Sequence, residues 1–165
     1  MRNLFRLIFL ALIVGAGIWL WLVLFPSPQK AILKQMARLS AAATYDTGDN
    51  NLVRAGKASR VAGLFTTDAE VVVNAPSQGT HHISGQEDIR NATLAGFANL
   101  PSLKVKFLDT SAQLAADRQS AVVSCTAQVW ANDSKDFDVQ EMRFQFKKVD
   151  GNWQISRAET VKTLQ

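Results

Sequence analysis

One uninterrupted apolar run, from Leu7 to Phe25, limits what the first part of this chain can become. Its nineteen residues carry no charge, Pro26 follows them, and Arg2 and Arg6 precede them. A helix of this length is about 28 Å long, close to the hydrocarbon thickness of a bilayer, and it satisfies its own backbone hydrogen bonds. The sequence therefore predicts a transmembrane anchor, with residues 1–26 as the cytoplasmic tail and the membrane-spanning helix.

Two alternatives to an anchor remain open. A cleaved signal peptide also begins with positive charge, but its apolar region is shorter and ends in a small-residue cleavage site. Here Trp19 and Trp21 lie near the end of the run, and a Phe-Pro-Ser-Pro stretch follows. A buried core helix is the second alternative, although a segment that is apolar on every face, with Trp at its boundary, suits lipid better. Ala11 and Gly15 have the spacing of helix pairing in lipid.

The charges that flank the run do not set its orientation, because Arg2 and Arg6 on one side face Lys30, Lys34 and Arg38 on the other. A short tail before the run and a folded domain after it favour export of the domain. In a bacterium this makes the chain a single-pass protein of the inner (cytoplasmic) membrane, with its C-terminal domain in the periplasm.

Residues 27–165 have the length of one ordinary domain with a real core. They contain all fourteen acidic residues and sixteen of the eighteen Lys and Arg residues, which leaves a net charge of +2. The basic residues are scattered, so we expect no nucleic-acid partner. The single cysteine, Cys125, cannot form an intramolecular disulfide; we expect it to be a small buried residue, and it leaves the redox compartment open.

Helical patterns come first in this domain. Ser27 and Pro28 are typical of an N-cap followed by proline in the first turn, and they predict a helix that runs to about Tyr45. A second helix and two short β-branched strands follow. Ser84 and Glu87 then have the spacing of a capping box, which predicts a third helix that ends near a proline.

Strand patterns fill the second half of the domain. Apolar and polar residues alternate along 103–107, 120–132 and 141–147, and Asp150-Gly151 is a hairpin signal before the last strand. The order predicts an α+β fold: a strongly curved antiparallel sheet with three helices packed on one face.

Three segments together resemble a known family: the helix-to-strand passage at 61–69, the helix entry at 83–89 and the closing hairpin at 148–155. From Lys30 to Thr163 the chain resembles the nuclear transport factor 2-like superfamily, which includes ketosteroid isomerases and SnoaL-type polyketide cyclases. The resemblance implies a cone-shaped sheet wrapped around three helices, with a pocket at the open end. Because this fold hosts isomerases, cyclases, dehydratases, assembly modules and transport factors, it implies shape far more than activity.

The last strand supplies two candidate ligand-binding residues, Arg157 and Glu159. With a period of two, they continue the face on which Trp153 and Ile155 point to the core. A buried unpaired charge is too costly, so two interpretations remain. The two side chains form an ion pair that closes the end of the core, or they line a cavity and orient a polar ligand.

Three further candidates are Trp130, Asp109 and Tyr45. Trp130 is expected to face the cavity. Asp109 continues the inward phase of its strand, so either it enters the mouth of the pocket or it is a turn residue at the end of the strand. Tyr45, the only tyrosine, is relevant because an isomerase-type site needs a carboxylate base beside a tyrosine or a protonated carboxyl group. No catalytic residue of the family matches a motif in this chain, so none is assigned.

We expect no metal and no cofactor. His81 and His82 are adjacent in an extended segment, so their side chains leave opposite faces and cannot chelate one ion together. The sequence also lacks a phosphate-binding glycine loop and a nucleophile elbow.

The sequence thus predicts a membrane-anchored, periplasmic, non-catalytic binding or assembly module with a small apolar pocket. Its expected partners are the lipid bilayer, a small apolar ligand, and either a membrane protein complex or a second copy that pairs through the outward face of Glu141 and Arg143. The alternative is a membrane-tethered SnoaL-like or isomerase-like enzyme that uses Asp109, Tyr45 or Glu159 on a small apolar substrate.

Overall fold

A computed structural model of the chain describes residues 14–15, 27–75 and 79–161. Within these ranges the domain is built from helices and strands with the following bounds: α2 (Pro28–Ala43), α3 (Asn51–Ala62), β1 (Phe65–Ala75), β2 (Gly79–Ser84), α4 (Gln86–Asn99), β3 (Leu103–Leu114), β4 (Ser120–Ala131), β5 (Asp138–Val149) and β6 (Asn152–Thr160).

The predicted membrane segment lies outside the described residues, except for Val14 and Gly15. No helix in the described part of the chain has the length and apolar character that a membrane crossing requires.

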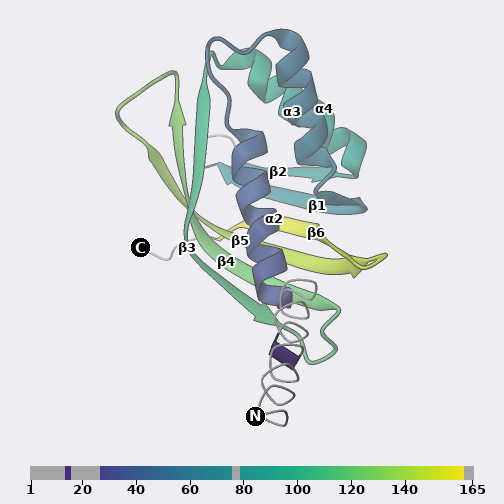
Figure 1. The fold of residues 1–165 in the computed structure, drawn as a ribbon. Coiled ribbons are helices and arrows are strands. Elements are labelled where there is room, and N and C mark those ends of the chain that lie inside the picture. The colour runs from purple at the N-terminus through teal and green to yellow at the C-terminus, as the bar shows by residue number, and fades with distance from the viewer. Residues whose placement is uncertain (1–13, 16–26, 76–78, 162–165) are drawn as a thin grey trace, which may run out of the picture.

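The six strands form one curved sheet in the order β2-β1-β6-β5-β4-β3, and α2 lies across its concave side (Figure 1). The predicted α+β class, with a curved sheet and three helices, is confirmed. The expectation of a wholly antiparallel sheet was wrong, because β1 pairs with β6 in parallel while every other pairing is antiparallel. Hydrophobic alternation indicates which face of a strand is buried, but it carries no information on strand direction.

Two helix starts follow the capping rules. The Ser27 hydroxyl accepts a hydrogen bond from the backbone N–H of Lys30 at 3.4 Å, and Asn50 accepts one from Val53 at 2.9 Å. The predicted capping box at the third helix is not formed. Gly85, with a φ of 87°, is the N-cap of α4, and Ser84 stays in β2, where it pairs with Glu70.

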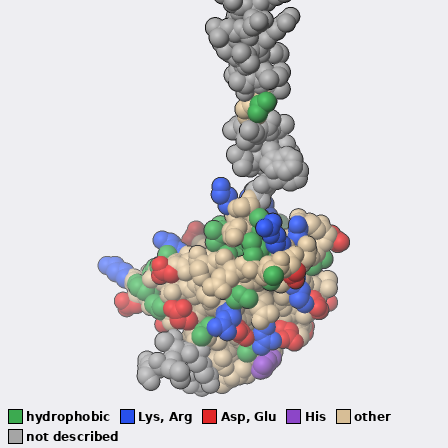
Figure 2. Space-filling view, turned by 90° about the horizontal axis from the view of Figure 1, so that it is seen from below, with side chains coloured by type: hydrophobic (Ala, Val, Ile, Leu, Met, Phe, Trp, Pro, Cys, Tyr) green, Lys and Arg blue, Asp and Glu red, His purple; other side chains and the backbone are tan. Residues whose placement is uncertain are grey.

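The core lies between α2 and the inner face of the sheet. Ile32 and Met36 of α2 pack there with Phe144 and Phe146 of β5. Cys125 is buried in the same cluster, as expected, and its desolvation raises the pKa of the thiol to about 12. The face of the domain seen in Figure 2 is different: basic and acidic side chains are interspersed there with hydrophobic ones.

Candidate functional site

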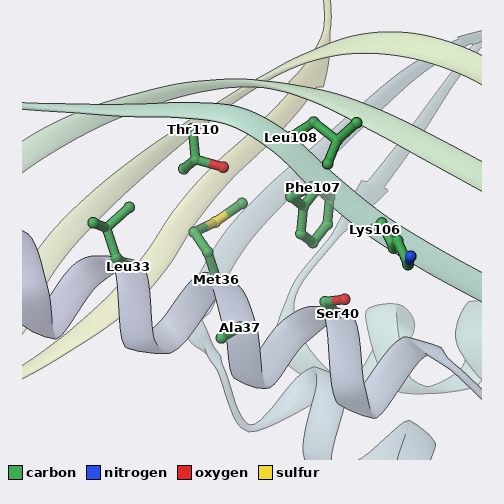
Figure 3. Close-up of a pocket in the computed structure, with 8 residues that line it drawn as sticks. All are labelled: Leu33, Met36, Ala37, Ser40, Lys106, Phe107, Leu108 and Thr110. Carbon is green, nitrogen blue, oxygen red and sulfur yellow. The ribbon is translucent and has the colours of Figure 1, made fainter.

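A groove of about 330 Å³ opens between α2 and β3, the edge strand of the sheet (Figure 3). Leu33 and Met36 point from the helix toward the strand, and Phe107 and Thr110 point from the strand toward the helix. The described residues that line the groove are mostly apolar: Leu33, Met36, Ala37, Ser40, Lys106, Phe107, Leu108 and Thr110.

The groove begins where direct bonds between α2 and β3 end. Leu103 and Tyr45 exchange two backbone hydrogen bonds, at 2.8 and 3.0 Å. Val105 is bound next: its N–H donates to Thr44 Oγ1 at 3.1 Å, and its carbonyl accepts from Ser40 Oγ at 2.6 Å. Beyond Val105 the described residues provide no further bond between helix and strand edge, and the groove occupies that space.

The lining suits an apolar group rather than acid–base chemistry. Leu33 and Leu108 are each 40% exposed, whereas Met36 and Phe107 connect the groove to the core. Among the described lining residues, Lys106 is the single charged group, and none is an Asp, Glu, His, Cys or Tyr. Such a groove can accept an apolar side chain or a small apolar molecule, with hydroxyl groups at Ser40 and Thr110.

Sequence reasoning did not find this groove. The available signal was the row Leu33, Ala37 and Ser40, which have helical spacing beside the buried row of α2. The angle at which α2 crosses the sheet edge decides whether that row is covered, and no local pattern reports that angle.

A β-bulge at Ser156 explains why Arg157 and Glu159 do not face the core. Ile155 pairs with Phe146, and Arg157 pairs with Gln145, so Ser156 is an additional residue in β6. Ile155 and Ser156 are therefore both buried, and the face of every later residue is reversed. The expectation that Arg157 and Glu159 continue the face of Ile155 was wrong.

On the outer face these two residues belong to a network of four charged side chains. Arg157 binds Glu159 at 3.0 Å and Glu70 of β1 at 2.5 Å. Arg143 of β5 lies 3.5 Å from the second carboxylate oxygen of Glu159. Of the two interpretations of Arg157 and Glu159, the ion pair is present, but on the solvent side of the sheet.

Asp109 also departs from its predicted phase, because β3 has a register shift between Leu108 and Ser111. Asp109 has a φ of 49° at this shift, and it is exposed. The alternation of buried residues in β4 places Trp130 on the outer face, where its ring lies 5.1 Å from that of Phe137. The expectation that Trp130 faces the cavity was therefore wrong, and of the two interpretations of Asp109 the inward one was wrong.

Tyr45 is buried, with 1% of its surface exposed, and its hydroxyl donates to the carbonyl of Leu100 at 3.0 Å. Burial raises the pKa of this phenol, against the opposing effect of the Arg54 guanidinium, which lies 4.8 Å from the ring centre. The ring packs against Phe97 in a small cluster at the end of α2. None of the five predicted site residues lines the groove.

The described ranges contain no group of three or more His, Cys, Asp or Glu side chains that could hold a metal ion. His81 and His82 are exposed neighbours in β2, and their partners in β1 are Val73 and Val72.

Comparison with known proteins identifies the fold. No protein-family model matches the chain, and no curated protein sequence matches it. Among solved structures, a nuclear transport factor 2-like protein with a cystatin-like fold from Novosphingobium aromaticivorans is similar with a TM-score of 0.62 at 17% identity, over 89% of this chain and 86% of that one. A domain with a cystatin-like fold from Nostoc punctiforme has a TM-score of 0.65 at 13% identity, over 86% and 80% of the two chains. A proposed scytalone dehydratase from Novosphingobium aromaticivorans has a TM-score of 0.57 at 20% identity, over 82% and 84%. At such identities the likeness establishes shape and not activity, so the chain has the cystatin-like fold of nuclear transport factor 2-like proteins.

Proposed function

We propose that this chain is a single-pass, membrane-anchored and periplasmic binding or assembly module that does not catalyse a reaction. Its working part is the groove between α2 and β3, which takes an apolar side chain or a small apolar molecule. The observation that carries the proposal is the lining of this groove, which is apolar and without an acid–base pair among the described residues.

The sequence supports the membrane attachment. Only Pro26 and Ser27 separate the apolar run from the first residue of α2. A module anchored by that run holds the groove, which begins at Leu33, close to the bilayer surface. Apolar molecules and membrane proteins are concentrated there, so this position suits both kinds of partner.

The rival function is a membrane-tethered SnoaL-like or isomerase-like enzyme. A proposed scytalone dehydratase among the structures of similar shape favours it. The positions of the three candidate residues speak against it. Tyr45 donates to a backbone carbonyl, Glu159 is bound within an ion network on the outer face, and Asp109 is exposed at a bulge. A shared reaction site needs such groups within hydrogen-bond reach of one substrate.

Native mass spectrometry of the full chain, released from its own membranes in mild detergent, tests the binding function. We expect a small apolar molecule or a partner protein at one per chain, lost in Ala37→Trp, which fills the groove. Ala95→Trp is the matched control, because Ala95 is an exposed helical alanine on α4. Retention of the bound species in Ala37→Trp would contradict the proposal.

Membrane attachment is tested separately. We expect the chain to resist extraction by alkaline carbonate, and the domain to be cleaved by protease added to spheroplasts. Cleavage only after the inner membrane is broken would place the domain in the cytoplasm and contradict the predicted orientation.

A further inference from the structure

Two successive arrangements occupy the edge of β3. At Leu103 the backbone of Tyr45 provides an antiparallel bridge with two hydrogen bonds. At Val105 the side chains of Ser40 and Thr44 replace that backbone. The edge of β3 therefore already pairs with one extended residue, Tyr45, and the residues that precede Tyr45 lie in α2.

The next position on this edge is Phe107. In an antiparallel pair, alternate residues direct their N–H and C=O to the same side. The backbone N–H and C=O of Phe107 therefore point to the same side of β3 as those of Leu103 and Val105. None of the described residues provides a hydrogen bond to Phe107 on that side. One backbone donor and one acceptor are thus directed into the groove, which is the arrangement that an added strand requires.

The groove also offers a wall for the side chains of such a strand. Leu33 is exposed on α2 and points toward the strand across the groove (Figure 3), and the exposed Ala37 lines the same groove. Successive side chains of an extended segment point to opposite faces. Alternate side chains of an added segment can therefore rest on α2, while the others face solvent.

Two lysines of β3 lie beside this edge, and Lys30 and Lys34 are exposed on α2. Lys106 lines the groove, and the ammonium groups of Lys104 and Lys106 lie 5.7 and 5.6 Å from the centre of the Trp130 ring. None of these four lysines forms an ion pair with an acid in the described ranges. Lysines on an edge strand repel basic or identical strands, so they select an acidic one.

We propose that the β3 edge at Phe107 binds an extended, acidic segment of a partner protein by strand addition, with apolar side chains of that segment seated on Leu33 and Ala37. This inference rests on the proposed function and names the partner class for the same groove. The bulge at Asp109 bends the edge just beyond Phe107, so the added strand is short.

The test uses the full chain in lipid nanodiscs and a synthetic seven-residue peptide in which Asp or Glu alternates with Val. Two variants of the peptide are N-methylated, one at the valines and the other at the acidic residues. Each variant loses the donors of one edge and keeps the same side-chain sequence. We expect the unmodified peptide to bind, one N-methylated variant to bind at least tenfold more weakly, and the other to bind like the unmodified peptide.

Protein variants locate the binding. Ala37→Trp should abolish it, while Ala95→Trp should not. Lys106→Glu should weaken binding of the acidic peptide several-fold, whereas Lys148→Glu, at an exposed lysine of β5, should leave it unchanged.

Several results would overturn the inference and leave the proposed function standing. If both N-methylated variants bind with equal affinity, strand addition is wrong. It is also wrong if no peptide binds while Ala37→Trp still removes the species bound in native membranes. Self-association of the peptide-free chain that Ala37→Trp prevents would make a second copy the occupant. If Ala37→Trp changes nothing in membranes or with peptide, the proposed function fails as well.

Discussion

The two faces of β5 and β6 differ in what holds them. On the inner face, Phe144, Phe146 and Ile155 are each no more than 2% exposed and pack in the main core. On the outer face, Arg143 and Arg157 bind carboxylates in a network whose side chains remain partly exposed. Apolar burial stabilises a fold in proportion to the area removed from water, whereas exposed ion pairs are screened. The inner face should therefore determine stability, although the outer face carries the network of charged side chains.

Phe146→Ala tests how much the inner face contributes to stability. Loss of a fully buried aromatic ring should lower the free energy of unfolding by about 3–5 kcal/mol, because the surrounding core cannot close the cavity. Gln145→Ala, one residue away on the outer face, should cost about 0.5 kcal/mol or less. Urea denaturation measures both, and similar losses in the two variants would show that the faces do not differ as argued.

Cys125 gives a chemical measure of the inner face. With its pKa raised from about 9 to about 12, the thiol is much less ionised than an exposed one. At pH 8 its thiolate fraction should be about a thousandfold lower, and alkylation by iodoacetamide should slow by at least that factor. Addition of 8 M urea should restore the ordinary rate. Rapid alkylation of the folded protein would mean that this face opens readily.

The same thiol makes stability depend on pH. Because the folded state holds the proton more tightly than the unfolded state, the contribution of Cys125 is complete below pH 9 and is lost as pH rises toward 12. Cys125→Ser removes this titration, so the loss of stability between pH 9 and pH 11 should be smaller in that variant. If the free energy of unfolding falls as steeply between pH 9 and pH 11 in Cys125→Ser as in the unchanged protein, Cys125 is not the group responsible.

Local sequence signals predicted the elements because local interactions determine them. Ser27 before Pro28, the alternation from Leu103 to Phe107, and the Asp150-Gly151 turn each act within a few residues. Strand direction was not predictable in this way, since the parallel pairing of β1 with β6 joins segments that are far apart in sequence.

The site was less predictable than the fold. A single additional residue, Ser156, reverses the face of Arg157 and Glu159, and the shift near Asp109 does the same for β3. The bulge at Ser156 has no glycine or other local marker, and the one marker at the other bulge is Asp109 itself, a residue type that adopts a positive φ more readily than most. The groove depends on where α2 leaves the edge of β3, which is a property of packing between distant segments.

Tyr45→Phe tests the contribution of a buried polar group beyond the end of α2. The variant removes one hydrogen bond to Leu100, and the free energy of unfolding should fall by about 1 kcal/mol. The loss stays small because Arg54 also donates to the Leu100 carbonyl, at 3.3 Å. A loss of several kcal/mol in thermal or urea unfolding would show that the phenol organises more of this cluster than its one bond.

Arg157→Gln should have the smallest effect, although it breaks two ion pairs at once. The Arg157 side chain is 35% exposed, so water and salt screen its bonds to Glu70 and Glu159, and the expected loss of stability is below about 1 kcal/mol. That loss should shrink further in 0.5 M NaCl, while the loss from Phe146→Ala should not. Because Arg157 lies on the outer face and away from the groove, the species bound in native membranes should also be retained. A large, salt-insensitive loss, or release of that species, would mean that the outer face holds a desolvated site, and that the inner face alone does not account for the fold.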